Sequence, residues 1–180
     1  MKSLVRALSI LLILISNCVF GQKFLTENEI KENLPEWFLK DNLLNGLIVN
    51  KDYIFDNRLD PIYIEADFNG DGNIDIAIPI KQIKGGKVGF AIFHGHTNEI
   101  YIIGAGIEIK NGLSDNMNYI DIWKVNREKI NEAGLEENTR KGEKGELILE
   151  YPSLQIEKSE VGGGQIYWNG KEYAYFHQTC

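Results

Sequence analysis

The residues best suited to chemistry in this chain lie in one nine-residue run, positions 67–75. Oxygen-bearing side chains occupy every second position of the run, and glycine occurs where a short loop must turn sharply. A loop of this composition can wrap around a hard cation, and Ca²⁺ takes about six to eight such oxygen ligands. The run therefore predicts a calcium site whose ligands are Asp67, Asn69, Asp71, Asn73 and Asp75.

The spacing of the run matches the first nine positions of an EF-hand loop, with Asp67 as position 1. Gly72 would supply the tight turn at position 6, and Asn73 at position 7 would offer its backbone carbonyl. The match ends at Ile78, which replaces the bidentate glutamate and belongs to a strand-like sequence. We therefore expect the loop to join two strands and to bind Ca²⁺ with a dissociation constant on the order of 10⁻⁴ to 10⁻³ M.

A turn that binds no metal is the alternative, because Asn, Asp and Gly are common turn residues in any case. In that case three carboxylates would crowd into nine residues and repel one another. Cation binding is therefore the favoured interpretation.

The segment 66–77 resembles the core motif of FG-GAP/VCBS repeats, the units of integrin-type β-propellers. The resemblance implies an acidic loop that joins two strands and binds Ca²⁺ through the same five residues. Only one copy of the motif is visible, whereas a propeller needs several blades. The length of the chain therefore excludes a full propeller, and the adhesion roles of the family do not follow. Gly21-Gln22 and the segment 166–173 also resemble small exported Bacteroidetes-type proteins of unknown function, which implies no activity.

Residues 1–21 have the pattern of a secretory signal peptide. Lys2 and Arg6 precede an apolar stretch that is too short to span a bilayer, and Gly21 is a small residue before the expected cleavage. The protein is therefore expected to be exported, periplasmic or extracellular, with no membrane span in the mature chain. Lipidation at Cys18 is an alternative, although the residue before this cysteine is not small as such a site requires.

The mature chain, residues 22–180, is expected to form a single β-rich calcium-loop domain. Removal of the signal peptide takes away two basic residues and no acidic one, so the formal net charge changes from −7 to −9. Such a surface repels nucleic acid and anionic membranes. Cys180 would be the one remaining cysteine, so no intramolecular disulfide could form and a bound metal would be a valuable source of rigidity.

The hydrophobic pattern predicts a mainly β (α+β) fold, an antiparallel β-meander of about seven or eight strands with an N-terminal helix. A capping box at Thr26 begins the helix, and Pro35 is a point at which the helix could divide. Pro79 cannot donate a hydrogen bond within a sheet, so its nitrogen should face outward or lie at a bulge. The polar segment 126–146 is predicted to be an exposed excursion. The expected strands are 62–66, 74–80, 88–94, 99–103, 120–125, 147–151, 154–156 and a hairpin at 165–177, for which Asn169-Gly170 favours a type I′ turn.

Two further groups of side chains could do chemistry. The first is a histidine set that could bind a transition metal, although its first two members lie in a turn-like segment: His94, His96 and His177. The second is one face of the final hairpin, which we interpret as core rather than as a platform for a sugar: Ile166, Trp168, Tyr173, Tyr175 and His177. No spacing in the sequence marks two carboxylates as a catalytic pair.

The sequence predicts an exported, calcium-stabilised, non-enzymatic binding or interaction domain whose unknown partner is a protein or a glycan. The alternative is an envelope glycan hydrolase that uses acidic residues near the aromatic face. Two carboxyl groups about 5–10 Å apart in a pocket beside Trp168 or Tyr175 would support the hydrolase, and a fully buried aromatic face would weaken it.

Overall fold

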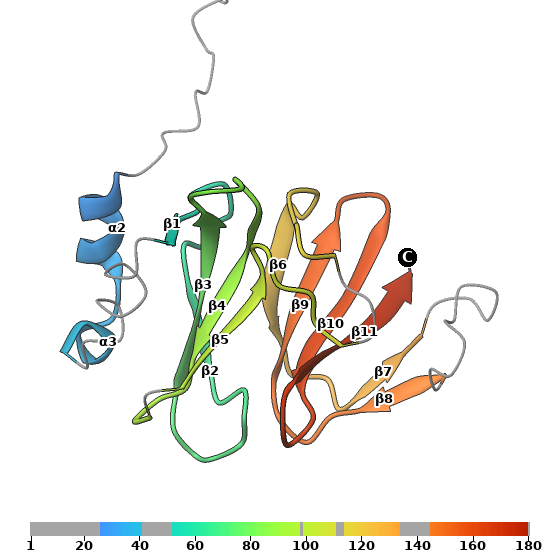
Figure 1. Cartoon of the computed structure of the whole chain (residues 1–180). Coiled ribbons are helices and arrows are strands. Elements are labelled where there is room, and N and C mark those ends of the chain that lie inside the picture. The colour runs from blue at the N-terminus through green and yellow to red at the C-terminus, as the bar shows by residue number, and fades with distance from the viewer. Residues whose placement is uncertain (1–25, 41–51, 98, 111–113, 134–144, 180) are drawn as a thin grey trace, which may run out of the picture.

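The computed structural model of the chain describes residues 26–40, 52–97, 99–110, 114–133 and 145–179. These residues form two antiparallel sheets packed face to face, with two short helices against the outer face of one sheet (Figure 1). The mainly β class is confirmed, with eleven strands in the described residues in place of the seven or eight expected. The predicted signal peptide, Cys18 and Cys180 lie outside the described residues.

The first sheet has the order β1-β3-β4-β5, with β2 also paired to β3, and the second has the order β11-β10-β9-β6. The strands of the first sheet are β1 (Tyr53–Phe55), β2 (Ile64–Ala66), β3 (Asp75–Gln82), β4 (Val88–Phe93) and β5 (Ile100–Gly104). Those of the second are β6 (Ile122–Asn126), β9 (Ser153–Lys158), β10 (Gly162–Trp168) and β11 (Tyr173–Thr179). A separate two-stranded ribbon consists of β7 (Ile130–Glu132) and β8 (Glu146–Ile148). The predicted single meander is thus replaced by two sheets that form a sandwich, and in each sheet one strand, β1 or β6, pairs with a strand that does not directly follow it in the chain.

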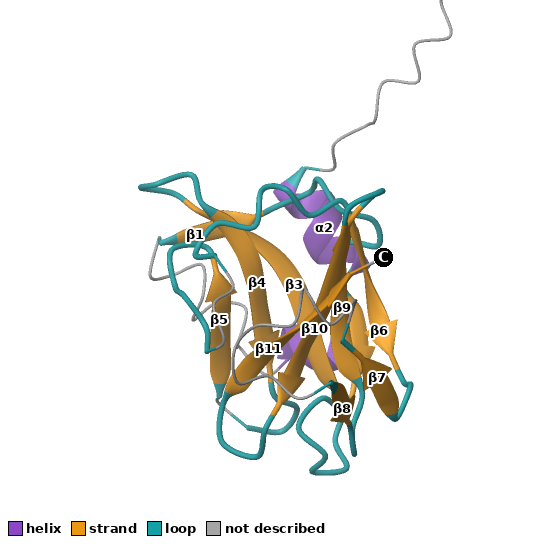
Figure 2. Ribbon diagram, turned by 90° about the vertical axis from the view of Figure 1, so that its right-hand side faces the viewer, coloured by secondary structure: helices purple, strands orange, loops and turns teal. Residues whose placement is uncertain are grey.

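Helices α2 (Glu27–Asn33) and α3 (Glu36–Lys40) follow the predicted capping box and division at Pro35. The Thr26 hydroxyl accepts a hydrogen bond from Glu29 N (3.3 Å), and the Glu29 carboxylate accepts one from Thr26 N (2.8 Å). The apolar side chains of the two helices pack on the outer face of β3 and β4, where the rings of Phe38 and Phe93 lie 4.8 Å apart. Figure 2 shows both helices on the side of the first sheet that faces away from the second.

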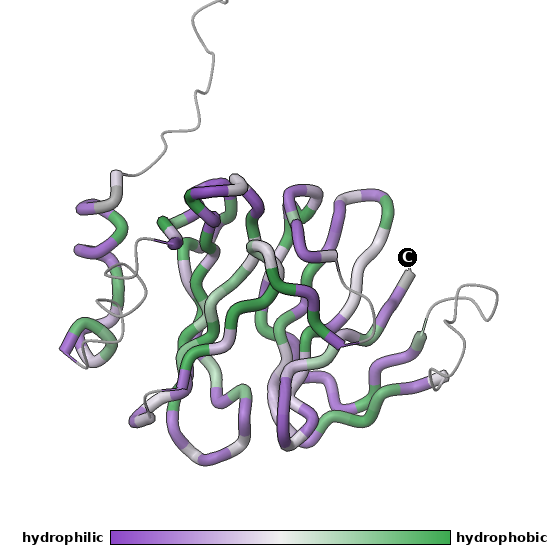
Figure 3. The backbone as a smooth tube through the Cα atoms, viewed as in Figure 1, coloured by the Kyte–Doolittle hydropathy of each residue, from purple (hydrophilic) through white to green (hydrophobic). Residues whose placement is uncertain are grey.

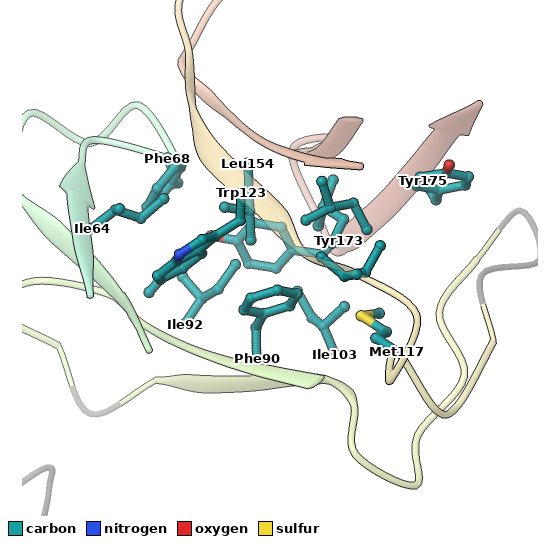
Figure 4. Close-up of a cluster of buried hydrophobic side chains, with 14 of the residues drawn as sticks. Ile64, Phe68, Phe90, Ile92, Ile103, Met117, Trp123, Leu154, Tyr173 and Tyr175 are labelled. Carbon is teal, nitrogen blue, oxygen red and sulfur yellow. The ribbon is translucent and has the colours of Figure 1, made fainter. Parts of the chain in front are cut away.

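The central strands β3 and β4 are buried on both faces, because the helices cover one face and the second sheet covers the other. The core between the sheets contains large side chains from both, and the rings of Phe90 and Trp123 stack across it at 5.2 Å (Figure 4). Hydropathy follows this plan, since the central strands are largely hydrophobic and the loop at the β2–β3 end is largely hydrophilic (Figure 3). A strand that is buried on both faces needs a covering layer on each side of its sheet, and here the helices and the second sheet are those two layers.

Pro79 lies in the middle of β3, opposite Phe90 of β4. Its carbonyl accepts a hydrogen bond from Asp56 N (2.9 Å), just beyond the end of β1. Because the carbonyl and nitrogen of a residue in an antiparallel strand face the same neighbour, the Pro79 nitrogen faces the break between β1 and β2. The proline therefore costs the sheet no ladder bond with β4.

The described part of the segment 126–146 is largely exposed, as predicted, and it also contributes β7 and part of β8; residues 134–144 lie outside the described residues. One local prediction is wrong. The last hairpin does not turn through a type I′ turn at Asn169-Gly170, because Gly170 has a positive φ (93°) and Asn169 does not. Instead the Asn169 side chain accepts hydrogen bonds from Lys171 N and Glu172 N, both at 3.0 Å.

Candidate functional site

The acidic loop joins β2 to β3, as the spacing predicted. Ala66 and Asp75 are paired across the two antiparallel strands, so residues 67–74 form the loop of a hairpin. Ile78 lies in β3 and is fully buried against the helices, which confirms that the EF-hand pattern stops before its last ligand. In Figure 1 the loop lies at the lower end of the first sheet.

Asp75 is fully buried and serves as the clamp of the loop. One of its oxygens accepts hydrogen bonds from Phe68 N (2.8 Å) and Asn69 N (3.3 Å). The other accepts from Gly95 N (2.8 Å), in the turn between β4 and β5. Burial raises the pKa of the Asp75 carboxyl, and these N–H bonds, that of Gly95 first, oppose the rise. Asp75 therefore ties the acidic loop to the neighbouring turn through protein contacts alone.

The other side chains of the loop bond to its own backbone. The two oxygens of Asp67 accept from Gly70 N (2.7 Å) and Gly72 N (3.0 Å). Both glycines have left-handed φ angles, 77° and 86°, so the sequence places glycine where the turn needs it. Asp71 accepts from Asn73 N (2.8 Å) in the same manner. A carboxylate has about four lone-pair sites, so these oxygens retain capacity for a cation.

Asp71 is the most exposed acid of the loop, and its environment favours the ionised form. Slight desolvation raises the pKa of the Asp71 carboxyl, but bonds from Asn73 and Asn69 and the charge of His94 together hold it below its usual value. The ordinary pKa of an aspartate is already about 4, so Asp71 is negative at neutral pH.

His94 connects the acidic loop to the second sheet. Its buried ring has Nδ1 3.1 Å from Asn69 Nδ2 and Nε2 2.8 Å from the Tyr173 hydroxyl. The Asn69 amide also donates to Asp71 (3.0 Å), and His94 Nδ1 lies 3.3 Å from Glu99 Oε2 as well. The His94 ring packs at 4.7 Å from Tyr101 and at 5.2 Å from Trp168. No pattern in the sequence indicated this role for His94.

Among the described residues, no group of three or more His, Cys, Asp or Glu side chains is arranged to hold a metal ion. The proposed histidine set is thus not assembled, since His94 lies in an aromatic cluster, His96 lies in an exposed turn and His177 lies beside Tyr175. The predicted calcium ligands include an asparagine side chain and a backbone carbonyl in addition to carboxylates. The donors of the loop are hard oxygens, and those of Asp67, Asn69, Asp71 and Asn73 are half-buried or exposed, so they fit Ca²⁺ in kind and in access. Calcium binding stays a prediction.

The aromatic face of the last hairpin is core, as we favoured. The pairs Trp168–Tyr173 and Ile166–Tyr175 place these side chains on one face, as predicted. Ile166, Tyr173 and Tyr175 are buried between the sheets, and Trp168 packs against this core partly exposed. Figure 4 shows Tyr173 and Tyr175. Burial also raises the pKa of the Tyr173 hydroxyl well above its usual range. A sugar platform on this face is therefore excluded for the three buried residues.

Tyr151 is a neighbour of the acidic loop that the sequence did not indicate. A Cβ atom added to Gly70 would lie 2.1 Å from Tyr151 Cε1, so the tyrosine ring rests directly on the glycine. Gly70 and Tyr151 lie far apart in the sequence, and no periodic pattern indicates such a contact. The glycine thus has two roles: it adopts a left-handed backbone conformation, and its lack of a side chain lets the Tyr151 ring pack against it.

Comparison with known proteins gives no relative from which a function could be transferred: no family model matches the chain, and no curated protein or solved structure is significantly similar. Within the described residues, no helix is long and apolar enough to cross a membrane. Function is therefore inferred from the site itself.

Proposed function

We propose that the protein is an exported, calcium-stabilised, non-enzymatic domain that binds a protein or glycan partner. The observation that carries the proposal is the β-hairpin loop in which oxygen donors alternate around two left-handed glycines. The signal-peptide pattern of residues 1–21 supports export. Extracellular and periplasmic modules meet Ca²⁺ at concentrations that suit a site of modest affinity.

A structural rather than a sensing role for Ca²⁺ is supported by how the loop is held. Asp75, at one end of the loop, accepts from Phe68 N at the other end and from Gly95 N of the neighbouring turn, so the hairpin does not depend on a cation for its path. A cation would instead offset the repulsion between Asp67 and Asp71. Binding would then raise stability without a large change of conformation.

A non-enzymatic role is supported by the surroundings of Trp168. Among the described residues, Glu150 supplies the one carboxylate that lines the cavity beside Trp168, whereas a glycoside hydrolase needs two. Of the face that would have carried a substrate, Ile166, Tyr173 and Tyr175 are packed into the core, and Trp168 is partly exposed. The hydrolase alternative thus gains no support from this site.

Thermal unfolding of the mature chain, residues 22–180, in EDTA and in 10 mM CaCl₂ tests the proposal. With a dissociation constant of about 10⁻⁴ to 10⁻³ M, this concentration should stabilise the native state by about 1.4–2.7 kcal/mol. For a domain of this size the midpoint should rise by about 3–11 °C. An unchanged midpoint would refute calcium binding.

Asp71→Asn sharpens this test, because the asparagine can still accept from Asn73 N but carries no charge. It should remove most of the calcium-dependent shift and leave the melt in EDTA nearly unchanged. Asp52→Asn is the matched control, since Asp52 is also exposed and lies at the far end of β3 from the loop. This control should keep the full calcium response.

A further inference from the structure

A cavity of about 370 Å³ lies beside the acidic loop, between the β8–β9 connection and the β10–β11 turn. Its volume is at the lower end of the range for small-ligand sites, about 300–1,000 Å³. The side chains that matter for binding are Glu150, Tyr151, Tyr167, Trp168 and Asn169. Glu150, Tyr151 and Asn169 are exposed, so the cavity opens to solvent.

The lining combines flat aromatic rings with a few polar groups. Tyr151 and Trp168 line the cavity, and aromatic rings with polar edges suit the C–H surface of a pyranose ring. Glu150 and Asn169 can exchange hydrogen bonds with sugar hydroxyls. Glu150 is the charged residue of the lining, and the chain as a whole is acidic, so a phosphate or an acidic sugar would be repelled.

The aromatic walls are held in place before any ligand arrives. The Trp168 ring makes edge contacts with Tyr101 (5.2 Å), His94 (5.2 Å) and Tyr173 (5.1 Å). The Tyr151 ring rests on Gly70, and Phe68 of the acidic loop also lines the cavity. Rings fixed in this way lose little conformational entropy on binding.

We infer that this cavity binds a pyranose ring of a neutral glycan. The inference rests on the proposed function, because it names the ligand class of the binding domain. The sugar would lie at the loop end of the sandwich, and not against Ile166, Tyr173 and Tyr175, the buried residues of the last hairpin. The acidic loop would then form one wall of the binding site.

Calorimetric titration of the mature protein with neutral oligosaccharides tests the inference, using cellotriose, laminaritriose, N,N′,N″-triacetylchitotriose and mannotriose, followed by an array of neutral glycans. At least one should bind, and tri-galacturonate should not. A proline-rich peptide serves as the comparator for a protein ligand. Failure of all neutral glycans to bind, or saturable binding of the peptide alone, would overturn the inference.

Two variants locate the binding. Tyr151→Ala should weaken glycan binding about tenfold, because it removes one stacking ring. Tyr119→Ala is the matched control, since Tyr119 is 41% exposed and Tyr151 is 38% exposed, and it should bind as the wild type does. Glu150→Gln keeps the shape of an exposed side chain, so it tests the polar contact without risk to folding, and it should also weaken binding. Unaltered affinity in both Tyr151→Ala and Glu150→Gln would place the glycan elsewhere and overturn the inference.

The calcium melt and the glycan titration fail separately. A calcium-dependent midpoint without glycan binding would leave the calcium site standing and refute the cavity. Glycan binding that depends on Tyr151, without any calcium response, would support the cavity and refute the calcium role.

Discussion

Replacement of Asp75 tests whether a buried carboxylate holds the acidic loop to the fold. Asp75→Ala removes the acceptors of three backbone N–H groups, those of Phe68, Asn69 and Gly95. The bonds from Phe68 and Gly95 are buried, so their N–H groups cannot turn to water without opening the structure. The substitution should therefore destabilise the domain even when no cation is present.

The magnitude follows from these bonds. A hydrogen bond to a charged group contributes about 1.5–3 kcal/mol, and a buried donor left without a partner costs about 1–3 kcal/mol. Loss of the carboxylate also removes its desolvation cost, which is the cause of its raised pKa and offsets part of the loss. We expect Asp75→Ala to lower the free energy of unfolding by about 3–5 kcal/mol, out of a typical total of about 5–15 kcal/mol. Asp75→Asn, with one acceptor oxygen, should recover at most about half.

Urea unfolding at pH 7 in EDTA measures this loss without a contribution from calcium. Asp71→Asn is the control within the same loop, and its exposed position should limit its effect to about 0.5 kcal/mol. The slope of the transition should not change, because the native fold stays the same. A loss below about 1 kcal/mol for Asp75→Ala would show that water reaches these N–H groups, and would refute the claim that the Asp75 carboxylate holds the acidic loop to the fold.

Two further predictions concern other parts of the fold. Phe68→Ala should cost about 3–5 kcal/mol in urea unfolding, because this loop side chain is 1% exposed in the core between the sheets; a cost near zero would contradict that burial. The bonds from Lys158 and Ser159 lower the pKa of Asp121 to about 2, below its unfolded value of about 3.9. Asp121 should therefore favour the native state above about pH 4 and lose this effect between about pH 4 and pH 2. Asp121→Asn should flatten this part of the stability curve, and an NMR titration midpoint near 4 for Asp121 would contradict the prediction.

Features that depend on neighbouring residues could be predicted from the sequence. The capping box from Thr26 to Glu29, the hairpin around the acidic loop and the shared face of Trp168 and Tyr173 all follow from spacing over a few residues. Turn conformation was less certain even at this range. At Asn169 the side chain, not the backbone, satisfies the following N–H groups, and composition alone does not distinguish these two solutions.

The division into two sheets could not be predicted, because it depends on pairing between distant segments. Strand β6 pairs with β9 across the β7–β8 ribbon, and β1, β7 and β8 have only three residues each, too few to show a period. The same limit hid His94. A histidine after an apolar strand gives no sign that the hydroxyl of a tyrosine 79 residues later will lie within hydrogen-bond distance of its ring.

The five predicted calcium ligands have different relations to the fold. Asp75 is buried and has three N–H partners, whereas the other four residues are half-buried or exposed at the tip of the hairpin. A carboxylate that is already engaged by the backbone has less capacity for a cation, which agrees with a site of modest affinity. The acidic loop should therefore keep its path in EDTA and gain rigidity in Ca²⁺. Phe68 of this loop lines the cavity, and Gly70 contacts the ring of Tyr151, which lines it too. A more rigid loop would therefore also hold the wall where we infer that a glycan binds.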